Sequence, residues 1–509
     1  MIRAILSVGS WTLVSRVTGF ARDVAMAAVM GAGPLADAFV VAFRLPNHFR
    51  AIFGEGAFNT AFVPAYAGLA ETGAEGAAQA FADRIFTLML GLQIVLLALA
   101  LPLMPWVVGA LAPGFSADPE RFALAVALTR ITFPYLLFMT LVTLLSGVLN
   151  AQRRFAVAAG APVLLNLAVL AALALAFLFP DAAHAAAWGV SVSGVLQFGL
   201  LWWGCRRAGA APRLARPSLR DPAMARFFAV LGPAVIGSAG FQIAAFADTI
   251  IASWLPAGAV SALYYADRLY QLPFGVIAIA AGTVLLPEMS RRIAAGDVAG
   301  AHAAQNRAAG FSLALSAPFT VAFLTLPGLI MAALFQRGAF SAEDAARAAS
   351  VLAAYGLALP AVVLVRSAVA SFYSRQDTTT PLWASLTAIL VNVGLKLWLT
   401  GPYGVTGLAL ATAVGQWVNL VLLAGLAWRR GWAAPGRTLG LTGLGVALGC
   451  AALAGVAVYG LPLAEALVPA LPRGREVAVL ALLGLAGAAV YGGLVAGLLH
   501  LFGLRLRRA

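Results

Sequence analysis

Apolar segments long enough to cross a membrane recur along the whole chain, separated by short polar or proline-containing connections. A membrane-spanning helix needs about 20 mainly apolar residues. By that measure the pattern predicts about fourteen spanning helices and no extramembrane domain. Their expected ranges are 4–31, 34–65, 84–111, 122–150, 156–179, 185–205, 225–254, 258–287, 307–335, 345–373, 379–400, 404–428, 438–461 and 475–502.

The first predicted helix carries one polar face within otherwise apolar sequence. An α-helix turns by about 100° per residue, so Arg16, Arg22 and Asp23 fall on one side of it. The same side holds Thr12, Ser15, Thr18 and Gly19. A charged side chain near the bilayer centre costs roughly 2.5–3.5 kcal/mol. We therefore expect these arginines to face water, protein or a ligand, and not lipid.

The second predicted helix repeats this arrangement, with charged and amide side chains on nearly one stripe. The stripe consists of Asp37, Arg44, Glu55 and Asn59. Pro46 removes a backbone donor, and Gly54 and Gly56 flank Glu55, so we expect a bend or break in this helix. Broken helices of this kind line substrate sites in transporters.

Composition agrees with an all-α polytopic membrane protein. Of 509 residues, 62% are hydrophobic and 10% are charged, and the mean hydropathy is +0.93. In a soluble protein a net charge of +14 would suggest nucleic-acid binding. Here most arginines fall in alternate connections, which is the pattern of cytoplasmic loops. We therefore expect no nucleic-acid partner, and both termini in the cytoplasm.

The first and second halves of the chain resemble each other in sequence. At one constant offset Gly9 matches Gly232, Pro64 matches Pro287, and Arg84 matches Arg307. After small insertions the series continues to Asn166 with Asn392. Six spans form each copy, so the copies have parallel topology. The predicted divisions are an N-lobe at 1–207, a cytoplasmic basic linker at 208–224, a C-lobe at 225–430 and two further helices at 431–509.

Four arginines are expected to line a central cavity between the lobes: Arg16, Arg22, Arg50 and Arg268. Arg44 is a weaker candidate because Asp37 lies nearby and would neutralise it, as Asp267 would neutralise Arg268. The alternative is a structural network, in which Arg16 or Arg22 pairs with Asp23 and Arg44 pairs with Asp37. Arginines outnumber carboxylates in this region, which favours the cavity.

A separate polar pair lies in the second half of the chain. Asp248 and Lys396 both lie well inside apolar spans, and Asn392 precedes Lys396 by one turn. A carboxylate within the membrane is a candidate ion or proton site, and a nearby lysine is its natural partner. Two interpretations stay open, a fixed internal salt bridge and an ion-coupling site.

Several kinds of chemistry are excluded by missing motifs. The single lysine, Lys396, is followed by leucine, so the chain has no Gly-Lys-Ser/Thr loop for ATP. The four histidines lack metal-ligand spacing, and no HExxH or GxSxG sequence occurs. We therefore expect a transporter and not an enzyme, with no cofactor and with the membrane potential or an ion as its energy source.

A cavity lined by guanidinium groups suits a phosphate or pyrophosphate, because arginine forms bidentate, charge-assisted bonds with phosphate. Carboxylates or nucleotides would also fit a basic lining. The two C-terminal helices, 438–461 and 475–502, are almost free of charge. They either border a groove for a long hydrocarbon tail or serve only in packing or assembly.

Several long motifs resemble the MurJ (MviN) lipid II flippases of the multidrug/oligosaccharidyl-lipid/polysaccharide exporter superfamily. They are SRVTGFARD, GAGPLADAFVVAFRLPN, FGEGAFNTAFVPAY, APGF, ITFPYLL, RFAVAAGAPVLLN, YYADRLYQLPFGV, TVLLPEMS and FYSRQDTTTP. The resemblance covers essentially the whole chain. It implies two six-helix lobes plus two helices. It also implies outward movement of lipid II, undecaprenyl-pyrophosphoryl-disaccharide-pentapeptide, across the bacterial inner membrane for peptidoglycan synthesis.

The resemblance also implies site residues. The family's cavity arginines correspond to Arg16, Arg22, Arg50 and Arg268, with Asp23, Asp37, Asn47 and Glu55 as motif neighbours. Asp248, Asn392 and Thr412 look like ligands of a sodium site in the family. Lys396 stands where another carboxylate is expected, so no metal ion is firmly predicted.

The expected mechanism is alternating access driven by the membrane potential, with lipid II, membrane lipids and cell-wall synthesis proteins as partners. Four other functions stay open. A drug/cation antiporter of the same superfamily is disfavoured by the arginine surplus. A flippase for another polyprenyl-linked oligosaccharide would share the basic cavity. A membrane-embedded transferase would need an essential carboxylate and usually a metal. A cell-wall assembly scaffold would tolerate substitution of the cavity arginines.

Overall fold

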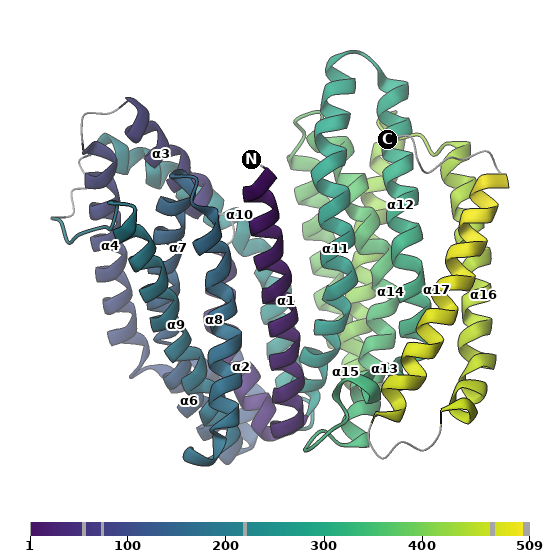
Figure 1. Cartoon of the computed structure of the whole chain (residues 1–509), viewed down its shortest axis with the longest axis horizontal. Helices are drawn as coiled ribbons and strands as arrows, with labels where there is room; N and C mark the ends of the chain where they lie inside the picture. Colours follow the sequence, from purple (N-terminus) through teal and green to yellow (C-terminus); the bar gives the residue numbers. More distant parts are fainter. Residues whose placement is uncertain (1, 53–57, 73–75, 217–220, 469–473, 502–509) are drawn as a thin grey trace. The chain divides into compact units, whose positions relative to one another are not determined.

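The computed structural model describes residues 2–52, 58–72, 76–216, 221–468 and 474–501. Within these ranges every regular element is an α-helix or a short 3-10 helix, and no strand occurs (Figure 1). Nine helical segments among the described residues are long and apolar enough to cross a membrane, and one of them, Pro119–Ala151, consists of two consecutive helices. The predicted class, an all-α polytopic membrane protein, is confirmed.

The chain forms two compact units. Unit 1 comprises Met1–Ser261 together with Arg337–Phe340, and unit 2 comprises Ala262–Gln336 together with Ser341–Ala509. The lobes 1–207 and 225–430 were inferred from sequence repeats, whereas these units are defined by how the chain packs. The lobes therefore stay a prediction.

Unit 1 is a bundle of helices in which α8 lies beside both α1 and α9 (Figure 1). Its helices are α1 (Ile2–Met30), α2 (Pro34–Ile52), α3 (Phe58–Thr72), α4 (Ala77–Ala100), α5 (Met104–Leu111), η2 (Pro113–Ala117), α6 (Pro119–Thr132), α7 (Tyr135–Ala151), α8 (Phe155–Ala174), η3 (Ala176–Leu178), α9 (Ala182–Arg207) and α10 (Pro222–Ser253). Helix α10 packs against α3 and α2. Buried Phe58, Phe62, Phe81 and Phe227 form an aromatic cluster that joins α3, α4 and α10.

Unit 2 is organised around α14, which packs against α12, α13 and α15. Its helices are α11 (Ala259–Ala294), whose first three residues belong to unit 1, α12 (Val298–Thr325), α13 (Pro327–Phe335), α14 (Ala342–Tyr373), α15 (Thr379–Arg429), α16 (Arg437–Leu467) and α17 (Arg475–Leu501). The last two pack against each other, and α16 also packs against α12. The Tyr491 hydroxyl of α17 donates to the carbonyl of Ala314 in α12 at 2.7 Å.

Proline and glycine divide several predicted spans. Pro134 separates α6 from α7 within 122–150, and Pro327 begins α13 within 307–335. A proline interrupts a helix because it lacks the backbone N–H and its ring clashes with the preceding turn. At Gly404 the backbone leaves the helical region, with φ 53° and ψ −134°. Helix α15 therefore covers two predicted spans, 379–400 and 404–428, and the irregular Gly404 marks the start of the second.

The predicted span 34–65 contains two described helices, and the end of the first does not lie at Pro46. Helix α2 continues through Pro46 to Ile52, so the chain does not break at the proline. A second helix, α3, begins at Phe58. Gly54, Glu55 and Gly56, where the break was also expected, lie outside the described residues.

The segment 337–340 between α13 and α14 docks on the end of α1 within unit 1. The N–H of Ala339 donates to the carbonyl of Ala28 at 2.7 Å. Gly338 has φ +59°, and a Cβ there would lie 2.1 Å from the Ala28 oxygen. Only glycine therefore fits this position.

Gly338→Ala is expected to lower the free energy of unfolding by about 1–3 kcal/mol, because the left-handed backbone is strained for alanine and the methyl group displaces Ala28. Thermal unfolding of the detergent-solubilised protein measures the change. Gly328→Ala is the matched control, since a Cβ at Gly328 meets nothing within 4 Å. Equal melting temperatures for the two variants would contradict the prediction.

Candidate functional site

Arg22 of α1 is buried and held in a defined orientation. It is 7% exposed, and its neighbour Asp23 is 3% exposed. Arg22 Nη2 and Nε donate to Asp23 Oδ1 at 2.7 and 3.1 Å. Arg22 Nη1 donates to Asn166 Oδ1 of α8 at 3.0 Å. The predicted pairing of Arg22 with Asp23 is present, and it fixes the direction of the guanidinium group.

Asn166 joins α8 to the polar face of α1. Its amide Nδ2 donates to the Ser15 carbonyl at 3.0 Å and to Thr18 Oγ1 at 3.1 Å. A Cβ on Gly19 would lie 3.4 Å from the same nitrogen, so the glycine permits this approach. Part of the face expected in water is therefore covered by α8. In the sequence, Asn166 stands out only as an amide within the apolar span 156–179 and as one matched position of the internal repeat.

Arg16, on the same helix, is not oriented by described residues as Arg22 is. Its side chain is half-buried, and it has no hydrogen bond or ion pair with any residue that the structure describes. It lies six residues before Arg22, which corresponds to about 9 Å along the helix axis. Helix α1 thus carries an oriented guanidinium and, less than two turns away, a second cation that no described carboxylate neutralises.

Asp37 of α2 is completely buried and accepts four hydrogen bonds. Arg121 Nη2 of α6 donates to Oδ2 at 2.5 Å, and the N–H of Gly258 donates to the same oxygen at 2.7 Å. The N–H and Oγ of Ser261 each donate to Oδ1 at 2.7 Å. The carboxylate therefore fastens α2 to α6 and to the residues that lead into α11.

Arg44 does not pair with Asp37, so that predicted neutralisation was wrong. The Asp37 oxygens are occupied by donors from Arg121, Gly258 and Ser261. Arg44 Nη1 instead donates to Thr249 Oγ1 of α10 at 2.5 Å. Arg121 belongs to the first turn of α6. The structure buries it to 6% exposure, with its guanidinium carbon 3.7 Å from the centre of the Phe115 ring.

Arg268 lies on α11, in unit 2. Its guanidinium carbon is 4.7 Å from the centre of the Tyr264 ring. Asp267 accepts a hydrogen bond from Gln271, and its proposed neutralisation of Arg268 stays a prediction. A further arginine within a spanning helix, Arg366 of α14, was missed; it is exposed and lies 5.9 Å from the centre of the Phe274 ring.

Two of the remaining predicted substrate residues, Asn47 and Arg50, belong to α2. Asn47 is half-buried in that helix. Arg50 belongs to the same helix, but its side chain lies outside the described part of the structure, as does the whole of Glu55. Their roles stay predictions.

The predicted ion or salt-bridge residues are divided between the units. Asp248 is half-buried on α10 of unit 1, whereas the other three lie on α15 of unit 2. Lys396 is completely buried, Asn392 is 6% exposed, and Thr412 donates to the Leu408 carbonyl at 3.1 Å. Within the described ranges no group of three His, Cys, Asp or Glu side chains is placed to hold a metal ion. The pairing of Asp248 with Lys396 stays a prediction.

Comparison with known proteins gives consistent matches. The family model described as "Lipid II flippase MurJ" matches residues 26–468, a range that begins after Arg22. The "Probable lipid II flippase MurJ" of Rhizobium meliloti (strain 1021) is 42% identical over 439 residues, covering 85% of this chain and 82% of that protein.

Two solved structures share the fold. The structure described as "Lipid II flippase MurJ, inward closed conformation" has a TM-score of 0.80 and 23% identity, covering 97% of this chain and 99% of that one. An inward-facing multidrug resistance MATE family transporter of the MOP superfamily has a TM-score of 0.69 and 16% identity, covering 84% and 97% respectively.

Proposed function

This chain belongs to the lipid II flippase MurJ family, and we propose that it moves lipid II from the cytoplasmic to the periplasmic leaflet of the bacterial inner membrane. The cargo is undecaprenyl-pyrophosphoryl-disaccharide-pentapeptide, which is used for peptidoglycan synthesis. The chain is a multi-pass membrane transporter. Arginine-rich connections are typical of the cytoplasmic side, and both termini fall on the same side as these connections, so we place the termini in the cytoplasm.

The observation that carries this proposal is the pair of guanidinium groups on α1. Arg22 is oriented by Asp23 and Asn166, and Arg16 has no partner among the described residues. A pyrophosphate offers several anionic oxygens, and arginine binds such oxygens with paired, charge-assisted hydrogen bonds. Arg16 and Arg22 would therefore hold the pyrophosphate of lipid II.

We assign the other predicted residues either to the anion site or to the support of that site. Arg50 and Arg268 would also contact the anion, and Arg44, Asn47 and Glu55 would lie beside it. Asp23 would act by orienting Arg22. Asp37, whose oxygens are already occupied by protein donors, would act by holding α2 in place and would not touch the substrate.

The proposed energy source is the membrane potential, with no cofactor. The binding residues would become accessible from the cytoplasm and then from the periplasm, which is alternating access. With the cell interior negative, each negative charge moved outward gains about 2.3 kcal/mol per 100 mV. Two charges on the pyrophosphate would gain roughly 4.6 kcal/mol per 100 mV, enough to drive transport without ATP.

Reconstituted vesicles test this energy source. Flipping of lipid II should slow when an ionophore collapses an imposed potential, and it should recover when the potential is restored. Undiminished flipping without the potential would exclude the voltage-driven mechanism but would leave the flippase assignment standing.

Depletion and complementation test the function itself. In a strain depleted of its own flippase, this chain should restore lipid II to the periplasmic leaflet. Restoration of another polyprenyl-linked oligosaccharide, without lipid II, would favour the alternative cargo. Restored growth with unchanged leaflet distribution would favour a scaffold for cell-wall synthesis proteins.

A further inference from the structure

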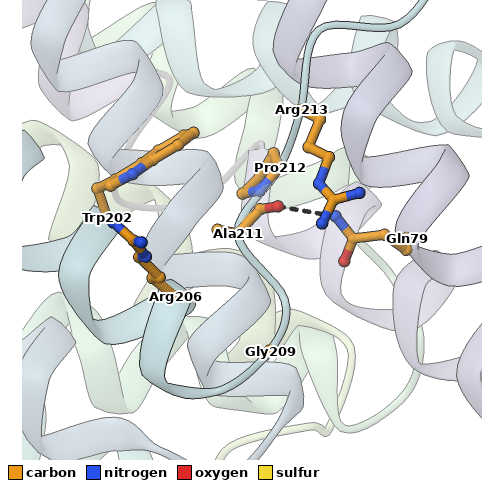
Figure 2. A pocket seen from close by; sticks show the side chains of 7 residues that line it. All are labelled: Gln79, Trp202, Arg206, Gly209, Ala211, Pro212 and Arg213. Atoms are coloured by element: carbon orange, nitrogen blue, oxygen red, sulfur yellow. Dashed lines mark hydrogen bonds between the residues drawn. The ribbon is translucent and has the colours of Figure 1, made fainter.

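A cavity of about 390 Å³ lies where α9 ends and the chain turns towards α10, within unit 1 (Figure 2). We define residues 208–216 as the strap. Trp202 and Arg206 of α9 line one side of the cavity, and Gln79 of α4 and Arg213 of the strap line the other. Figure 2 shows the strap passing between these two sides, with Ala211 and Pro212 at its centre.

Hydrogen bonds to α4 hold the strap in place. The Gln79 amide donates to the Ala211 carbonyl at 3.0 Å and to Asp83 Oδ1 at 2.8 Å. The N–H of Arg213 donates to the same Asp83 oxygen at 2.8 Å. The N–H of Ala215 donates to Thr87 Oγ1 at 2.9 Å. These bonds fix the backbone of the strap against α4. The strap is therefore a fixed wall of the cavity and does not close over it.

The cavity has an excess of positive charge. The side chains of Arg206 and Arg213 are exposed, and neither makes a hydrogen bond or ion pair with a described residue. None of the lining residues is a carboxylate, and Asp83, which holds the strap, already accepts hydrogen bonds from Gln79 and from the strap. The negative end of the α9 dipole would oppose an anion, but Arg206 and Arg207 lie in that last turn and offset it.

Beside Arg206, the α9 side of the cavity carries an aromatic residue of the kind found at membrane interfaces. Trp202 is half-buried and lies 5.7 Å from the Phe86 ring and 5.6 Å from the Phe198 ring, between ring centres. Leu214, which follows Arg213 in the strap but does not line the cavity, is 72% exposed. Tryptophan is enriched at the level of lipid headgroups, and basic residues on the cytoplasmic side attract anionic lipids.

We propose that this cavity binds a phosphate-bearing anion, namely the phosphate of an anionic phospholipid headgroup in the cytoplasmic leaflet. Arg206 and Arg213 approach the phosphate from α9 and from the strap, and Trp202 packs beside the glycerol backbone of the lipid. The site is separate from the guanidinium pair on α1, so it is a second anion site of the chain and does not depend on the proposed cargo.

Native mass spectrometry of the purified protein in detergent, titrated with phosphatidylglycerol, tests this site. Arg206→Gln and Arg213→Gln should each weaken retention of the lipid by about fivefold, as expected for loss of one basic residue near an anionic lipid. Arg206→Lys keeps the charge and should restore most of the binding. Phosphatidylcholine, which is zwitterionic, should bind more weakly than phosphatidylglycerol to the wild-type protein.

Arg207→Gln is the matched control, because it removes the same charge from the adjacent residue. Arg207 lies over the Trp203 ring, 4.1 Å from its centre, and does not line the cavity. Its substitution should change retention by less than about twofold. Equal losses in all three glutamine variants, or equal retention of phosphatidylcholine, would overturn the proposal.

Inorganic phosphate added as a competitor identifies the source of the anion. Failure of millimolar phosphate to displace phosphatidylglycerol supports a lipid site. Displacement that is lost in Arg206→Gln and Arg213→Gln would assign the cavity to a soluble phosphate and overturn the lipid assignment. Melting temperatures equal to the wild type confirm that each variant folds, as expected for exposed side chains.

Discussion

Arg16→Ala is expected to slow lipid II flipping by about 10- to 100-fold while leaving the free energy of unfolding unchanged. Hydrogen bonds to charged groups contribute about 1.5–3 kcal/mol, and each 1.4 kcal/mol is a factor of ten. Arg16 has no bonding partner among the described residues, so its removal leaves no protein group unsatisfied. A loss of transport without a loss of stability is the signature of a residue that contacts the substrate.

Arg22→Ala should lose as much activity and should also destabilise the protein. The substitution leaves Asp23 and Asn166 buried without the guanidinium to which they bond. An unsatisfied buried polar group costs about 1–3 kcal/mol. Comparison of the two variants therefore separates substrate contact from structural support on a single helix.

Complementation of a flippase-depleted strain, with lipid II measured in each leaflet, gives the activity, and thermal unfolding gives the stability. Arg307→Ala is the control for loss of an arginine, since Arg307 is exposed and has no hydrogen bond or ion pair with the described residues. Full complementation by Arg16→Ala at wild-type protein levels would refute a role for Arg16 in holding the pyrophosphate.

Asp37→Ala is expected to lower the free energy of unfolding by about 3–5 kcal/mol, because it leaves Arg121 buried without its counterion. Arg121→Met should cost less, since the Asp37 carboxylate would keep its bonds from Gly258 and Ser261. The double variant should lose less than the sum of the single losses, with a coupling of about 0.5–3 kcal/mol.

Thermal unfolding of the four proteins in one detergent measures this cycle. Glu71→Ala removes an exposed carboxylate that makes no hydrogen bond or ion pair with the described residues, and it should leave the melting temperature unchanged. Additive losses for Asp37→Ala and Arg121→Met would contradict the pairing. If Asp37 instead contacted lipid II directly, its substitution would slow flipping without affecting stability.

Helix positions follow closely from the sequence. Apolar runs of spanning length have to be helical in a membrane, because no water is present to satisfy the backbone. Each predicted span is occupied by one or two helices of the structure. Proline is a weaker guide to helix ends: α6 ends near Pro134, but α2 runs through Pro46. Helices tolerate proline where neighbouring groups satisfy the freed carbonyl.

The sequence by itself determined the fold class, most helix boundaries and the concentration of arginines on the first helices. These properties depend on neighbours along the chain, namely hydrophobic run length, helical period and charge. Only the tertiary structure decided which acid each arginine meets. Asp37 bonds to Arg121 and not to Arg44, and Asn166 covers part of the polar face of α1.

The physical reason is that an ion pair forms over a few ångströms in space, between helices far apart in sequence. Asp37 lies 84 residues from Arg121, and Arg22 lies 144 residues from Asn166. Periodicity shows which face of a helix is polar. It does not show which neighbouring helix covers that face, because that depends on how the helices pack.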